Sequence, residues 1–213
     1  FDLDADPLAI AQTLGASPQL APLIERYPGL RLPGGWDGFE VAVRAVLGQQ
    51  VSVAAARTLA TRIVQRFGTP VEMQGATGLN RLFPAPEQLA DANLDQMGIT
   101  QARINTIRGI ARALMEGRVA FAVEQPLETF ISQWVQLPGI GEWTAHYIAM
   151  RVLKHPDAFP AADLILRRQA NPDGAPLSTR VLQLQAESWR PWRAYSVMYL
   201  WRAATDSAAA RRV

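Results

Sequence analysis

The chain has 213 residues, which is enough for one large domain or for two smaller lobes that share a core. Hydrophobic residues make up 49% of it, as in folded proteins, and the absence of cysteine excludes disulfides, an iron–sulfur cluster, thiolate zinc sites and a cysteine nucleophile. The net charge is +2 and Lys154 is the sole lysine, so the positive charge is almost all arginine, which suits phosphate contacts without requiring them.

Helix signals follow one another along the whole chain. Capping side chains precede helical runs at Asp6, Ser17, Asp37 (with Glu40 as a capping box), Ser52 and Thr100. Further helices are expected over 126–136, 142–153, 163–170, 177–188 and 191–204. Alternation with a period of two is nearly absent, and 69–86 is the longest loop-like segment. The sequence predicts an all-α fold.

The segment LPGIGEWTAHYIAMRVL, residues 137–153, places a glycine turn between two predicted helices. The amides of Gly139, Ile140 and Gly141 lie at the start of the second helix, where a phosphate is favoured. A plain pair of helices with a glycine turn fits the pattern equally well. Trp143 and Tyr147 follow four residues apart and share a helix face, which indicates either core packing or a surface that stacks on a base.

The segment AFPAADLILRR, residues 158–168, holds a single carboxylate, Asp163, in an apolar approach to a helix. One interpretation is an N-cap, with Arg167 four residues later as an ion-pair partner. The other is a carboxylate that stabilises a positively charged sugar or activates a water at its anomeric carbon. The residues alone leave both open.

Two further segments attract attention. In SWRPWRAYSVMYLW, residues 188–201, most aromatic side chains should be core, and Arg190 and Arg193 either contact phosphates or are solvated. In VLGQQVSVAAA, residues 46–56, two helices meet at a tight turn that could insert a side chain into a DNA groove.

Together these segments resemble the helix-hairpin-helix DNA glycosylase superfamily, and more closely its bacterial 3-methyladenine-DNA glycosylase II (AlkA) type. The likeness runs in order from LRLPGGWDGFEVAVRAVLGQQVSV through LPGIGEWTAHY and FPAADLIL to WRPWRAYSVMYLW. It implies two helical lobes, 38–155 with the hairpin and 1–37 plus 156–213 with the catalytic acid, and an active-site cleft between them. It also implies that the N-terminal α/β domain of the full-length relative is lacking.

The resemblance also assigns roles to individual residues. Asp163 falls on the catalytic aspartate, and Trp143, Tyr147 and Trp201 fall on the pocket for the extruded base. The DNA contacts would come from Gln50, as the wedge that fills the gap left by that base, and from the hairpin residues Gly139, Ile140, Gly141 and Thr144. The backbone carbonyls of Val135, Leu137 and Gly139 would hold a monovalent cation when DNA is bound; no other cofactor is implied.

Two positions depart from the pattern of the close relative, and a third differs from the bifunctional members of the superfamily. The wedge is the polar Gln50 where the close relative has leucine, and Ala162 precedes the catalytic acid where a second acid is expected. The position of the lysine with which bifunctional members cut the strand is Trp143. This last departure, with the missing cluster cysteines, predicts a monofunctional enzyme without AP-lyase activity.

We therefore expect a monomeric glycosylase that removes alkylated bases of the 3-methyladenine and 7-methylguanine class from double-stranded DNA. No apolar run reaches the roughly 20 residues of a membrane span and no signal peptide is visible, so we expect a cytoplasmic, nucleoid-associated protein without membrane contact. The alternatives are a non-catalytic DNA-structure-binding module, a glycosylase for mismatched adenine or oxidised guanine, and a helical protein-interaction module.

Overall fold

The structure is a computed structural model that describes residues 2–72 and 80–210. The chain forms two compact units, one made of Phe1–Gly34 with Ala149–Val213 and the other of Gly35–Ile148. The sequence places the corresponding boundaries at residues 38 and 155. Over the described ranges the fold is helical, with a single isolated β-bridge between Pro70 and Arg81 and no strand, so the all-α prediction is confirmed. No helix in those ranges has the length and apolar character to cross a membrane.

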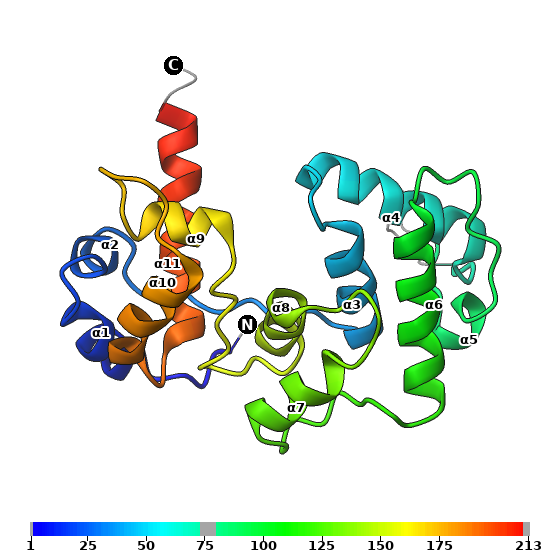
Figure 1. Cartoon of the computed structure of the whole chain (residues 1–213), viewed down its shortest axis with the longest axis horizontal. Coiled ribbons are helices and arrows are strands. Elements are labelled where there is room, and N and C mark those ends of the chain that lie inside the picture. Colours follow the sequence, from blue (N-terminus) through cyan, green and yellow to red (C-terminus); the bar gives the residue numbers. More distant parts are fainter. Residues whose placement is uncertain (1, 73–79, 211–213) are drawn as a thin grey trace. The chain divides into compact units, whose positions relative to one another are not determined.

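The unit Gly35–Ile148 is built around helices α3 and α6 (Figure 1). Its helices are α3 (Gly38–Leu47), α4 (Val53–Phe67), α5 (Pro86–Leu89), α6 (Gln101–Met115), α7 (Leu127–Trp134) and most of α8 (Glu142–Val152). Helix α6 packs against both α3 and α5. Ile104, Ile107, Ile110 and Ala111 of α6 are all buried, and Leu114 is half-buried, so one face of this helix contributes to the core.

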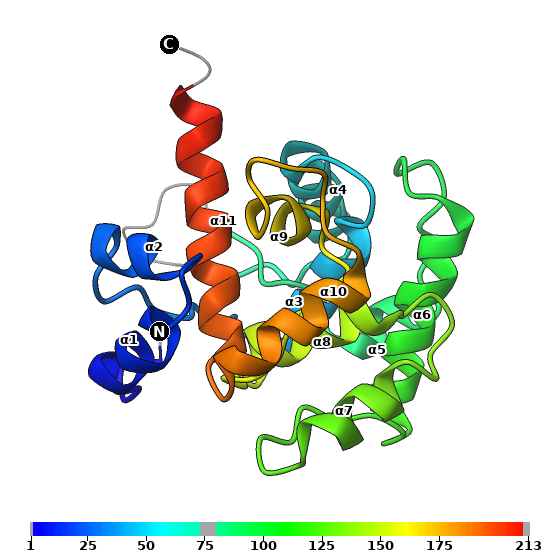
Figure 2. The ribbon, with the colours of Figure 1, turned by 60° about the vertical axis from the view of Figure 1, so that its left-hand side comes forward.

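The unit that contains both ends of the chain is built around the long helix α11 (Figure 2). Its helices are α1 (Pro7–Gly15), α2 (Ala21–Arg26), α9 (Leu164–Gln169), α10 (Thr179–Ala186), the 3-10 helix Glu187–Trp189 and α11 (Arg193–Ala210). Trp189, Tyr195 and Tyr199 are buried as expected, and burial raises the pKa of Tyr199. Helix α11 packs directly against α9, which brings the aromatic run beside the segment that follows Asp163.

Most helix starts agree with the sequence signals. Asp6, Asp37 and Ser52 cap α1, α3 and α4 with their side chains, as predicted, and Thr100 takes the N-cap position of α6 without a side-chain hydrogen bond. The capping box is only half formed, because the Glu40 side chain pairs with Arg44 instead.

One predicted helix start is wrong, and one short helix was not predicted. Helix α2 begins at Ala21 rather than after Ser17, whose hydroxyl bonds the Gln19 side chain and whose carbonyl closes a turn with the Leu20 amide. Helix α5 was not predicted, because four residues are too short for a recognisable period. Of the expected loop 69–86, residues 73–79 lie outside the described residues.

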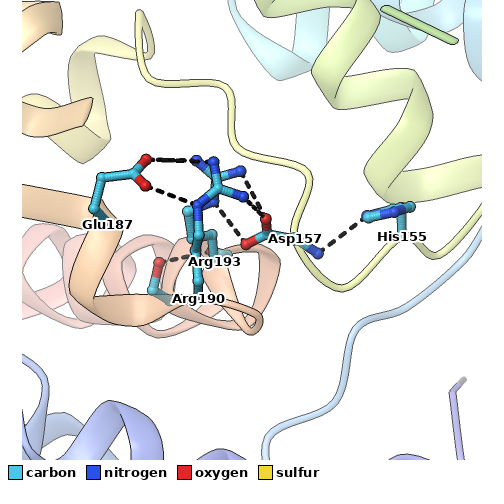
Figure 3. Close-up of polar contacts among 6 residues, drawn as sticks. His155, Asp157, Glu187, Arg190 and Arg193 are labelled. Carbon is cyan, nitrogen blue, oxygen red and sulfur yellow. Dashed lines mark hydrogen bonds and ion pairs between the residues drawn. The ribbon is translucent and has the colours of Figure 1, made fainter. Parts of the chain in front are cut away.

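An ion-pair cluster, whose Asp157–Arg193 pair is buried, joins the start of α11 to the loop that leads to Asp163 (Figure 3). Arg193 donates to both carboxylate oxygens of Asp157, at 2.7 and 2.8 Å. Arg190 contacts the same carboxylate and also pairs with Glu187, and its hydrogen bond holds the pKa of Glu187 below the ordinary value. The expectation of a phosphate contact or a merely solvated side chain is wrong for Arg193, which is buried, whereas Arg190 joins the cluster from an exposed position. Asp157, which the sequence did not single out, is its centre.

The cluster predicts a large effect for a small substitution. Asp157→Asn keeps the shape of the side chain but removes the buried anion that pairs with the Arg193 guanidinium and leaves it only the exposed Glu187 carboxylate at 3.3 Å, so the free energy of unfolding should fall by about 3 kcal/mol. Asp91→Asn is the matched control, because the Asp91–Arg112 pair is exposed and should contribute little. Chemical denaturation measures both variants, and equal losses would contradict the structural role of the cluster.

Candidate functional site

Asp163 is the N-cap of α9. Its Oδ1 accepts hydrogen bonds from the amides of Ile165 at 2.9 Å and Leu166 at 3.0 Å, so the N-cap interpretation of this residue is confirmed. The side chain is nevertheless half-buried rather than sealed in the core. Arg167, its suggested partner, donates its Nε–H to the carbonyl of Leu177.

The same carboxylate oxygen also meets an aromatic side chain of its own unit. The indole Nε1 of Trp201 lies 3.4 Å from Asp163 Oδ1, and the two helices that carry these residues pack together. Two backbone amides and one indole therefore donate to one oxygen and fix the orientation of the carboxylate. The capping role does not compete with a chemical role; it holds the acid in one place.

Trp143 and Tyr147 lie on one face of α8, as the spacing predicts. Their rings stack with centroids 5.4 Å apart and planes inclined by 17°, and both side chains are half-buried. A stacked aromatic pair with partly exposed rings can accept a further flat group by the same offset stacking. An electron-poor or cationic ring would be held most strongly.

The turn between α7 and α8 uses its first glycine for the fold. Gly139 has φ +87°, and a Cβ there would lie 2.0 Å from the Oγ1 of Thr106 on α6. Ile140 is buried and its amide donates to the Leu137 carbonyl at 3.0 Å, so this amide closes the turn. Gly139 and Ile140 thus fix the hairpin within the unit Gly35–Ile148.

The second glycine has no such explanation. Gly141 is exposed, a Cβ built there meets nothing within 4 Å, and its φ is not in the left-handed region. It directly precedes α8, and its carbonyl accepts the first bond of that helix, from Ala145. A bare backbone at a helix N-terminus leaves room for another molecule to approach the amides closely.

The turn between α3 and α4 presents Gln50 at its tip. This residue is exposed and has φ +54°, a left-handed conformation that is uncommon for a residue other than glycine. The neighbouring Gln49 donates its side-chain amide to the Gly139 carbonyl at 3.2 Å and to the Thr144 hydroxyl at 3.1 Å. Thr144, expected among the DNA contacts, is itself buried.

The three backbone carbonyls assigned to a cation lie in this hairpin. The Leu137 oxygen accepts one hydrogen bond from Ile140 and the Gly139 oxygen accepts one from Gln49. A carbonyl oxygen has two lone pairs, so each can still coordinate a weakly held monovalent ion together with the Val135 carbonyl. The donor set therefore fits such a cation. Among the described residues, no three His, Asp or Glu side chains gather as a metal site.

A family model described as HhH-GPD superfamily base excision DNA repair protein matches residues 43–194. The chain belongs to this superfamily. Residues 1–37, which fold in part as α1 and α2, match the AlkA N-terminal domain.

Individual relatives within the superfamily are also similar to this chain. The DNA-3-methyladenine glycosylase 2 of Escherichia coli K12 is 35% identical over 204 residues, which cover 94% of this chain and 68% of that protein. A probable bifunctional transcriptional activator/DNA repair enzyme AlkA of Mycobacterium tuberculosis H37Rv is 44% identical over 202 residues. The match covers 94% of this chain but only 40% of the mycobacterial protein. Among solved structures, a 3-methyladenine DNA-glycosylase of Archaeoglobus fulgidus has a TM-score of 0.77 at 27% identity, covering 92% of this chain and 68% of that one.

The two hairpin glycines should respond differently to the same substitution. Gly139→Ala adds a Cβ against Thr106 in a left-handed conformation and should lower the free energy of unfolding by about 2 kcal/mol or more. Gly141→Ala should cost less than about 1 kcal/mol, because its Cβ enters open space. Thermal unfolding distinguishes the two, and a large loss for Gly141→Ala would show that the fold requires this glycine as well.

Proposed function

We propose that this chain is a monofunctional DNA glycosylase that hydrolyses the N-glycosidic bond of alkylated bases in double-stranded DNA. The observation that carries the proposal is the carboxylate of Asp163, held by two α9 amides and the Trp201 indole in a chain of the base excision repair superfamily. Relatives named for 3-methyladenine support alkylated purines such as 3-methyladenine and 7-methylguanine as the substrate class.

The aromatic residues account for recognition of the damaged base. An N-alkylated purine carries positive charge, so it stacks favourably on electron-rich rings. The Trp143–Tyr147 pair supplies such rings and Trp201 supplies one beside the acid. The nucleotide must leave the duplex to reach them, and this costs less for a weakly stacked lesion than for a normal base.

The chemistry needs little more than the acid and a water. As the bond between C1′ and the base nitrogen breaks, its electron pair leaves with the base and neutralises the positive charge of the alkylated ring. Asp163 stabilises the positive charge that develops on the sugar, and water adds to C1′ and releases its proton to the solvent. Because the leaving group is already activated, the reaction needs no general acid, which agrees with Ala162 in place of a second carboxylate.

The hairpin and the α3–α4 turn account for the grip on DNA. The exposed backbone at Gly141 can approach a phosphate, and a monovalent cation on the Val135, Leu137 and Gly139 carbonyls would add positive charge there. Gln50 is the residue proposed to fill the gap left by the extruded nucleotide, while the buried Thr144 supports the interface from beneath. One chain carries all these groups, so we propose a monomer that acts on nucleoid DNA.

Asp163 is both the N-cap of α9 and the proposed catalytic carboxylate, and one substitution can separate the two roles. Asp163→Asn should reduce base release from methylated duplex DNA at least about a hundredfold, because the variant lacks the negative charge that stabilises the sugar cation. Asparagine caps helices as well as aspartate does, so folding and binding to abasic-site DNA should be largely retained. Released bases are measured by chromatography. Near-normal release by this variant would remove Asp163 from the mechanism, and no release by the unmodified protein would favour a non-catalytic DNA binder.

The second prediction concerns the DNA strand. Strand cleavage by a bifunctional glycosylase needs an amine that forms a Schiff base with the sugar, and the sole lysine, Lys154, lies beyond the end of α8 rather than at Trp143. The product should therefore be an intact strand with an abasic site, and borohydride should trap no covalent complex. Trapping that persists in Lys154→Gln would point to another amine, and trapping lost in that variant would assign a lyase activity to Lys154.

A further inference from the structure

The α3–α4 turn, Gly48–Ser52, holds an exposed side chain in an unfavourable backbone conformation. A left-handed φ of +54° at Gln50 costs about 1 kcal/mol or more unless its surroundings impose it. The turn is exposed at its tip, so packing around Gln50 itself does not impose this conformation. The restraint must come from the residues on either side.

Gln49 supplies this restraint through three of its polar groups. Its amide donates to the Val46 carbonyl at 3.3 Å, and its carbonyl, which belongs to the peptide linked to Gln50, accepts from the Arg103 guanidinium of α6. Its side-chain Nε2 donates to the carbonyl of Gly139 in the hairpin turn and to the hydroxyl of Thr144 in α8. The carbonyl of the peptide that precedes Gln50 is thereby tied to α6, and the Gln49 side chain is tied to the hairpin and α8.

The partners of Gln49 are themselves fixed to one another. Arg103 and Thr106 lie one turn apart on α6; the first holds the Gln49 carbonyl and the second packs against Gly139. The α3–α4 turn, the hairpin and α6 thus form a closed set of contacts within one unit. The Gln49 side chain is the hydrogen-bonded link between the hairpin and the turn.

We infer that Gln49 is a positioning residue that couples the hairpin's hold on the phosphate backbone to the insertion of Gln50. This inference rests on the proposed function. Gln49 does not touch the reacting atoms; its donor group fixes the separation between the residue that enters the duplex and the backbone that grips it. The role requires a donor, because both acceptors are oxygens that a methionine side chain of similar size cannot bind.

The test is a double-mutant cycle on the preference for a duplex with an abasic-site analogue over the same intact duplex. Gln49→Met should lower this preference roughly tenfold, since two hydrogen bonds are lost, and leave binding to the intact duplex unchanged. Thr144→Val removes one of the two acceptors and should lower the preference about threefold. In the Gln50→Ala background, either substitution should change the preference less than about twofold.

The cycle separates positioning from general destabilisation. If Gln49→Met lowers the preference equally with glutamine or alanine at position 50, or lowers intact-duplex binding to the same extent, the inference is overturned. If Gln49→Met does not fold, the Thr144→Val arm carries the same comparison. Base release by the unmodified protein is assayed in parallel, because its absence refutes the proposed enzyme while the binding cycle still decides the role of Gln49.

Discussion

The orientation of one carboxylate is the constraint on which the candidate chemistry depends. Asp163 Oδ1 accepts from two amides of α9 and lies 3.4 Å from the Trp201 indole nitrogen. A free aspartate samples several rotamers, and ordering it at the moment of reaction would add to the barrier. The N-cap bonds meet this cost during folding. The helix start is therefore part of the catalytic proposal and not an alternative to it.

The buried ion pairs extend this constraint along the chain. Arg193, the first residue of α11, holds Asp157 in the loop that ends at Asp163, and the Ala194 amide donates to the Pro156 carbonyl at 2.8 Å. The loop is thus fixed to the helix that also carries Trp201. Because desolvated charges gain little net stability from pairing, the value of this cluster lies in specifying one arrangement of loop and helix.

The sequence predicts most of the helices and the local partners within them, because caps and periodicity are short-range signals. Asp37, Ser52 and Asp163 cap their helices as predicted, and Trp143 and Tyr147 stack at the expected spacing. Contacts between residues far apart in sequence left no such signal. The Arg193–Asp157 pair spans 36 positions and the Gln49–Thr144 bond spans 95, and arginine or glutamine in isolation gives no indication of its partner. What could not be predicted was how tertiary contacts hold the functional groups.

The hairpin motif shows why a match to a sequence pattern mixes two kinds of information. Gly139 is required by α6, which leaves no room for a Cβ, and Ile140 closes the turn with its amide and fills the core with its side chain. No contact among the described residues requires glycine at position 141, since a Cβ there would enter open space. The same distinction applies to Gln49, whose backbone and side chain are hydrogen-bonded to other residues, and Gln50, whose side chain is exposed at the tip of the turn. Residues that the fold requires keep the motif in shape, and residues that it does not require are those on which an external ligand such as DNA can act.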